Sequence, residues 1–197
     1  MIRLPLLLTL VATVAAMAAK PAAPDALSSF RAEDRVLQGM LHRFPKETLG
    51  SSDSLKGQLN SMFGFAELGK RALGKTWAKQ SKADQDSFTI YFSRMLLKKS
   101  LESPQDYISD SAKHVLVGKP TNTGAVVSST VYRGTDQLTI TYTLFLDGGK
   151  WRICDLKQGE KPSQMDKYRD QFAKYLGKGS KKTFADLIAS IRKNAGA

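Results

Sequence analysis

Apolar side chains in the first hundred residues recur every three or four positions, which is the repeat of an amphipathic helix. A first helix is predicted by Phe30, Leu37, Met40 or Leu41, and Phe44, and it ends before Pro45. Further helical repeats cover residues 55–62, 65–77 and 81–103, up to Pro104. The candidate N-cap residues are Asp25 or Ser28, Asp53 or Ser54, and Ser81. The first half of the chain is therefore predicted to be helical.

From about Ser109 the repeat changes to two, which is the repeat of a β-strand. Residues 138–146 alternate almost strictly, with large apolar side chains at every second position and threonine at 139, 141 and 143 between them. The Asp147-Gly148-Gly149 sequence that follows is typical of a hairpin turn. Strands are predicted at residues 112–117, 125–133, 138–146 and 151–157. Their short connections predict an antiparallel meander, and its apolar face requires a cover of helices.

Helical spacing returns after the fourth strand. The segment Trp151–Phe172 leads from that strand through a polar link, Gly159–Ser163, into a helix whose apolar face includes Tyr168 and Phe172. A last amphipathic helix follows Gly177. The predicted fold class is α+β, with an antiparallel four-stranded sheet covered by N- and C-terminal helices.

The N-terminus has the three parts of a secretory signal peptide. Met1-Ile2-Arg3 is basic, residues 4–15 are apolar, and Ala16-Met17-Ala18 fits a cleavage site. We expect a signal peptide at 1–18, a flexible Pro/Ala linker at 19–27 and a single domain at 28–197. Cys154 is the only cysteine, so no disulfide forms within the chain, and we interpret it as a small apolar strand residue.

The net charge of +12 and the isoelectric point near 9.8 fit either an anionic partner or solubility alone. The basic residues do not alternate with exposed aromatic residues, and the protein is predicted to be exported. Nucleic acid is therefore not an expected partner.

Sequence motifs for catalysis or metal binding are missing: there is no phosphate-binding loop, HExxH, CxxC or nucleophile elbow. His42 and His114 lie far apart in the sequence. Asp155 is the one acidic residue inside a strand with apolar neighbours. It is either a general base or, as we favour, a structural acceptor where the strand leaves the sheet.

The apolar faces of the sheet and helices have two interpretations. They form an ordinary core, or they enclose a pocket for an apolar ligand between the two layers. The residue pattern alone does not separate these alternatives.

Several motifs, in order, resemble the MlaC family of periplasmic phospholipid-binding shuttles, also called the toluene-tolerance auxiliary family. Residues 65–77 follow its F-x-x-L-x-x-x-x-L-G-x-x-W pattern as FAELGKRALGKTW. Gln85, Phe88, Phe92 and Leu96 match in the next helix, followed by the WRICD, YRDQF and FADLI segments. The resemblance spans roughly 130 residues. The chain departs from the family pattern at Gly159–Ser163, where charged residues replace the apolar link that family members usually have, next to the expected pocket mouth.

The resemblance implies a periplasmic, non-enzymatic carrier with an apolar cavity between sheet and helices. Its cargo would be phospholipid, with no other cofactor and no metal. It would move lipid between an outer-membrane lipid complex and an inner-membrane ABC transporter complex. The candidate lipid-contacting residues are Phe65, Leu73, Trp77, Phe92, Leu96, Val131, Leu138, Ile140, Tyr142, Leu144, Trp151, Ile153 and Phe172.

Two other classes stay open. One is an envelope docking or structural protein with a filled core and a basic binding face. The other is an enzyme that uses Asp155 and a histidine at a pocket.

Overall fold

The computed structural model describes residues 24–197, without the side chains at positions 46 and 47. The predicted signal peptide (1–18) and residues 19–23 of the predicted linker lie outside the described residues. In chain order the elements are α1 (Ala26–Arg43), α2 (Lys46–Leu49), α3 (Asp53–Met62), α4 (Phe65–Leu73), the 3-10 helix η1 (Gly74–Lys79), α5 (Lys82–Glu102), the 3-10 helix η2 (Pro104–Tyr107), β1 (Ser111–Leu116), β2 (Gly124–Arg133), β3 (Asp136–Asp147), β4 (Lys150–Gln158), α6 (Gln164–Tyr175) and α7 (Phe184–Ala195).

Side-chain caps fix several helix starts. The Asp25 carboxylate accepts a hydrogen bond from the Ser28 N–H at 3.0 Å, and this bond holds the pKa of Asp25 below its ordinary value. Ser81 caps α5, as predicted. Thr183 and Asp186 form a capping box on α7, and hydrogen bonding to Thr183 lowers the pKa of Asp186.

Four details differ from the sequence-based predictions. α1 begins at Ala26, inside the predicted linker. The predicted loop after Pro45 contains α2, which buries Leu49 completely. α3 is capped by Ser52, because its hydroxyl accepts from the Leu55 N–H at 3.3 Å. The helix predicted over residues 65–77 is interrupted at Gly74, whose φ of 52° lies outside the helical range.

The four strands form one antiparallel meander in the order β1-β2-β3-β4, as predicted. Each strand begins and ends within two residues of its predicted bounds. Pairing of β3 with β4 shifts at Cys154: Leu144 lies opposite Ile153, but Thr143 lies opposite Asp155. This β-bulge reverses the alternation along the end of β4.

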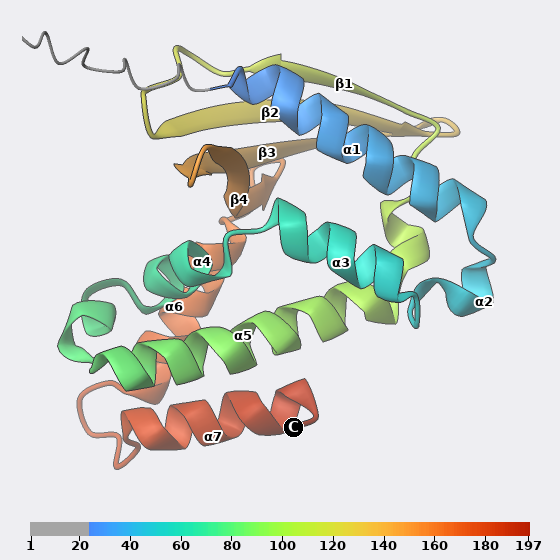
Figure 1. Cartoon of the computed structure of the whole chain (residues 1–197). Coiled ribbons are helices and arrows are strands. Elements are labelled where there is room, and N and C mark those ends of the chain that lie inside the picture. The colour runs from blue at the N-terminus through green and yellow to red at the C-terminus, as the bar shows by residue number, and fades with distance from the viewer. Residues whose placement is uncertain (1–23) are drawn as a thin grey trace, which may run out of the picture.

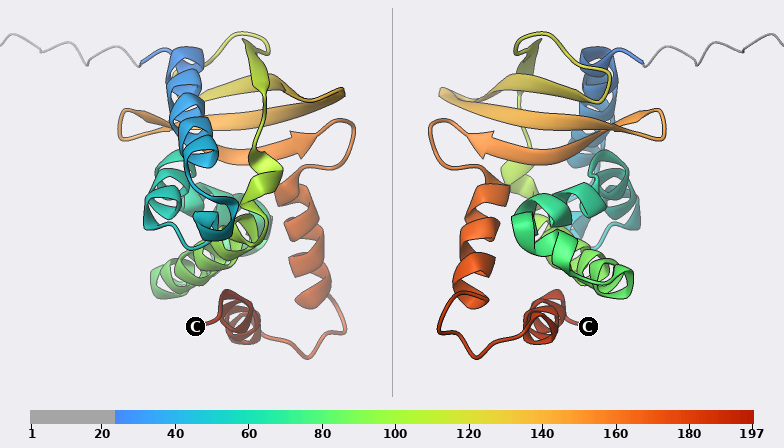
Figure 2. Two further views of the ribbon diagram at one scale, coloured as in Figure 1. Left: turned by 90° about the vertical axis from the view of Figure 1, so that its right-hand side faces the viewer. Right: turned by 90° about the vertical axis from the view of Figure 1, so that its left-hand side faces the viewer.

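The sheet lies at one end of the molecule, with α1 across one face (Figure 1). The helices α3 and α4 lie below it, and α5 and then α7 follow at the opposite end. The side views show α6 leading from β4 down toward α7 (Figure 2). The fold class is α+β, as predicted, although α6 contacts β4 whereas α7 packs on α5.

Three apolar clusters fill the space between these elements. One joins α1 and the sheet around Phe30, Val127 and Leu144. A second joins the ends of α1, α2, α3 and α5 through leucines. The third, around Phe88 and Phe92, joins α4, α5, α6 and α7. A ligand site would be expected between the first and third clusters, because ligand sites often lie where two packed layers meet.

Candidate functional site

A pocket of about 240 Å³ lies between the end of β4 and the helices α3, α4, α5 and α6. Its apolar wall consists of Leu59, Phe63, Phe65, Leu68, Leu96, Leu97, Leu156, Met165 and Tyr168. Its polar rim consists of Lys99, Ser100, Tyr107, Gln158 and Gln164, and Asp155 also lines it.

The burial of these residues distinguishes the inside of the pocket from its mouth. Leu68 and Met165 are each only 3% exposed, whereas Tyr107 is 51% exposed and Lys99 is also on the surface. The pocket is therefore apolar inside and polar at its opening, which suits an amphiphilic ligand. Gln158 and Gln164 flank the charged link Gly159–Ser163, so the segment that departs from the family pattern passes beside the mouth.

Asp155 holds the two elements that form this mouth. Its Oδ1 atom accepts hydrogen bonds from the N–H of Leu156 at 2.8 Å and of Met165 at 3.1 Å. Met165 lies in the first turn of α6, where N–H groups have no partner within the helix. The structural interpretation of Asp155 is confirmed, because this carboxylate joins the end of β4 to the start of α6.

Cys154 is fully buried at the bulge, as the sequence pattern predicted. Burial raises the pKa of its thiol to about 11. The thiol is therefore protonated at neutral pH and has the character of a core residue.

Of the thirteen predicted lipid contacts, the pocket wall includes Phe65 and Leu96. Leu73, Phe92 and Phe172 are buried in the helical cluster, where Phe92 and Phe172 meet edge-on with 5.8 Å between ring centroids. Trp77 packs against that cluster and lines a separate hollow of about 310 Å³.

The strand residues lie elsewhere. Leu144, Trp151 and Ile153 are buried beneath α1, and Tyr142 packs against the same cluster. Val131, Leu138 and Ile140 lie toward the β2–β3 hairpin, and Leu138 is 42% exposed. The structure thus brings only part of the predicted set to the pocket; lipid contact by the remaining residues stays a prediction.

The sequence analysis missed most of the pocket wall. Leu156 was missed because strict alternation along β4 assigns it to the face opposite Ile153, and the bulge at Cys154 reverses that assignment. Met165 and Tyr168 lay on the predicted apolar face of the α6 helix. Pairing that face with Leu96 and Leu97 of α5 requires the packing of the two helices, which no local pattern gives.

An aspartate, a histidine and a serine, the three residue types of a hydrolase triad, lie in contact beneath α1. His114 Nε2 lies 3.2 Å from Asp34 Oδ2, and His114 Nδ1 lies 2.7 Å from Ser129 Oγ. Ser129 is 1% exposed, so its hydroxyl is closed to a substrate. Nearby, burial raises the pKa of Tyr142. We interpret this cluster as a satisfied polar network that ties α1 to the sheet.

The other histidine is also structural: His42 Nε2 lies 2.9 Å from the Ser109 carbonyl oxygen. Neither His42 nor His114 lines the pocket, and Asp155 accepts backbone hydrogen bonds there. In the described part of the chain, no cluster of three or more His, Cys, Asp or Glu side chains is arranged to hold a metal ion.

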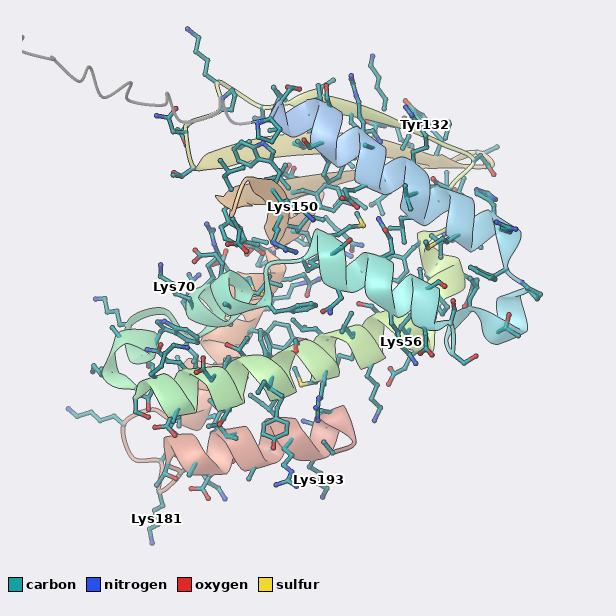
Figure 3. All side chains as sticks on the ribbon, in the orientation of Figure 1. Lys56, Lys70, Tyr132, Lys150, Lys181 and Lys193 are labelled. Carbon is teal, nitrogen blue, oxygen red and sulfur yellow. The ribbon has the colours of Figure 1, made fainter. Side chains whose placement is uncertain are left out.

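Basic side chains are spread over many elements. Lys56 extends from α3, Lys70 from α4, Lys150 from β4, and Lys181 and Lys193 from the region of α7 (Figure 3). This distribution does not single out one basic binding face. None of the helices within residues 24–197 has the length and apolar character needed to cross a membrane.

The sequence matches one family model, and the fold resembles a solved structure. The family described as MlaC protein matches residues 35–193. A search of curated proteins found no match. A solved structure of a phospholipid-binding protein from Ralstonia solanacearum, in complex with a phospholipid, is similar in fold, with a TM-score of 0.70. At 15% identity, the similarity covers 88% of this chain and 98% of the Ralstonia chain. The family match covers most of the sequence, and the chain belongs to the MlaC family.

Proposed function

We propose that this protein binds a phospholipid. An acyl chain lies in the pocket between β4 and α3–α6, and the head group lies at the polar rim. The observation that carries the proposal is the contrast between the apolar wall, in which Leu59, Leu68 and Met165 are buried, and the polar rim, in which Lys99 and Tyr107 are exposed. Each acyl CH₂ removed from water contributes about 0.8 kcal/mol, so a largely apolar wall is sufficient for tight binding. Family membership and the phospholipid bound to the Ralstonia protein support the same ligand class.

The pocket has to enlarge to hold a whole lipid. Its volume of about 240 Å³ is below the roughly 300–1,000 Å³ of typical ligand pockets. Phe63 and Phe65 line both this pocket and the neighbouring hollow of about 310 Å³, with their ring centroids 6.1 Å apart. Rotation of these two half-buried rings would join the two spaces, and we regard this as the route by which the pocket grows.

In this proposal the protein is a periplasmic carrier. It would take lipid between an outer-membrane lipid complex and an inner-membrane ABC transporter complex, and it would perform no reaction on it. Family membership, the signal peptide expected at residues 1–18 and a pocket that shields acyl chain from water support this role. Lipid itself is the cargo, and no other cofactor is needed.

The test is to purify the exported protein, extract it with organic solvent and identify the extracted lipid by mass spectrometry. Stripped protein is then incubated with liposomes, separated from them and extracted again. We expect about one phospholipid per chain in both extracts. Protein that carries no phospholipid from the cell and takes none from liposomes would contradict the proposal.

A further inference from the structure

Among the side chains that the structure describes, Lys99 is the one cation that lines the pocket. It projects from α5 at the rim, beside Ser100 and across from Gln164 at the start of α6. Its Nζ atom lies 5.8 Å from the centroid of the Tyr168 ring, which belongs to the apolar wall. The ammonium group is therefore held at the boundary between the apolar interior and solvent.

Within residues 24–197 this ammonium group has no acidic partner, since none of the ion pairs there includes Lys99. Among the described residues that line the pocket, Asp155 is the one carboxylate, and its Oδ1 atom accepts two backbone hydrogen bonds that stabilise its negative charge at the junction of β4 and α6. Lys99 thus leaves a positive charge available at the mouth.

We propose that Lys99 binds the phosphate of the lipid head group and makes the pocket selective for anionic over zwitterionic phospholipids. A phosphate at the rim accepts a charge-assisted hydrogen bond from the ammonium group. To donate this bond, the ammonium group moves away from the Tyr168 ring. In a zwitterionic lipid, the head group's own cation competes for the same phosphate. An anionic head group such as glycerol phosphate carries no such competitor.

The adjacent Lys98 provides a matched control. It is exposed on the same helix, but its Nζ donates to the Asn194 carbonyl oxygen at 3.3 Å, and it lines a different groove near the end of α7. Lys98→Gln and Lys99→Gln remove the same charge from neighbouring positions, so a general effect of net charge appears in both variants. An effect that appears in Lys99→Gln but not in Lys98→Gln therefore reports the loss of a contact at the pocket mouth.

The inference rests on the proposed phospholipid binding, and titration calorimetry with soluble lipids separates the two. The probes are dihexanoyl phosphatidylglycerol and dihexanoyl phosphatidylcholine, both below their micelle concentrations, which avoids attraction to a vesicle surface. We expect the unsubstituted protein to prefer phosphatidylglycerol. Lys99→Gln should weaken phosphatidylglycerol binding about tenfold and reduce the preference, whereas Lys98→Gln should stay within about twofold and Lys99→Arg should retain the preference.

Two results would overturn the inference, and they differ in what they mean for the proposed function. If the unsubstituted protein binds both lipids and Lys99→Gln matches Lys98→Gln, Lys99 is no head-group ligand and lipid binding stands. If protein stripped of lipid binds neither soluble lipid and also takes no phospholipid from liposomes, the proposed function fails and the inference fails with it.

Discussion

At the scale of single residues, Asp155 shows how one side chain connects the sheet to the pocket. Its carboxylate accepts hydrogen bonds from the N–H groups of Leu156, near the end of β4, and of Met165, in the first turn of α6. Its role follows from this position between two elements. The sequence suggested a structural acceptor, and the structure supplies the partners.

Replacing Asp155 with alanine should destabilise the protein by about 1–3 kcal/mol, because two backbone N–H groups lose their acceptor in a half-buried site. Asp155→Asn keeps an oxygen at the same place and should cost clearly less. Urea unfolding followed by circular dichroism measures both. Equal stability of the two variants would show that these hydrogen bonds do not hold α6 to β4.

Cys154 gives a pH-dependent prediction. Burial raises the pKa of its thiol from the ordinary 9.0 to about 11, so the folded state disfavours the thiolate. The thiol of the unfolded chain ionises first as the pH rises above 9, and this favours unfolding. The contribution of Cys154 to stability is therefore complete below pH 9 and lost as the pH rises through 11.

The measurement compares urea unfolding of the protein and of Cys154→Ser at pH 8 and pH 10.5. The stability advantage of the cysteine over the serine should shrink at the higher pH, since serine does not titrate in this range. An advantage that stays constant or grows with pH would mean that the thiol is not desolvated in the folded protein.

At the scale of elements, the α3–α4 junction fixes one end of the pocket wall. The Gly64 N–H donates to the Ile153 carbonyl oxygen at 2.9 Å, and Phe63 forms a bridge to β4. A Cβ atom on Gly64 would lie 2.1 Å from the Phe145 ring. The backbone between Phe63 and Phe65 is therefore packed closely against the sheet. Only the side chains of Phe63 and Phe65 are free to rotate at this junction.

Gly64→Ala should cost about 1–3 kcal/mol, because Phe145 has to move away from a backbone that is held by a hydrogen bond. Gly57→Ala is the control, since its Cβ atom meets nothing within 4 Å on α3 and alanine is the better helix former. Thermal unfolding should place the Gly64 variant below the unsubstituted protein and the Gly57 variant at or above it. A neutral Gly64→Ala would contradict the close packing at this junction.

The order and type of most elements could be predicted from the sequence, because their repeats of 3.6 and 2 are clear and turn residues separate the strands. Three features could not. The interruption at Gly74 depends on a backbone angle, the α2 turn depends on burial of Leu49, and the bulge at Cys154 depends on pairing with β3. The bulge matters most for function, since it explains why Leu156 was missing from the predicted lipid contacts.

At the scale of the whole molecule, the pocket lies where the layer of α1 and sheet meets the layer of α4, α5, α6 and α7. The predicted contact set was drawn from every apolar face, so it includes residues of both buried clusters as well as residues of the pocket wall. Only the packing of the layers distinguishes a wall residue such as Leu96 from a core residue such as Phe92. This distinction is a property of the assembled fold rather than of any one segment.

Filling the pocket should remove lipid binding without unfolding the protein. Leu156→Trp places a large ring on the wall from β4, whereas Val117→Trp adds the same ring at a position that is 51% exposed and outside the pocket. After incubation with liposomes, the Leu156 variant should retain at least about tenfold less phospholipid than the Val117 variant, with similar circular dichroism. Equal retention would place the lipid outside this pocket.

The central claim is that the acyl chain lies between β4 and α3–α6. It is tested most directly with a phospholipid that carries a photoreactive diazirine near the end of an acyl chain. The protein is loaded with this lipid and irradiated, and the labelled peptides are identified by mass spectrometry. We expect label on the peptides that contain Leu68, Leu96–Leu97 and Met165. Label confined to α1 or to the open face of the sheet would contradict the claim.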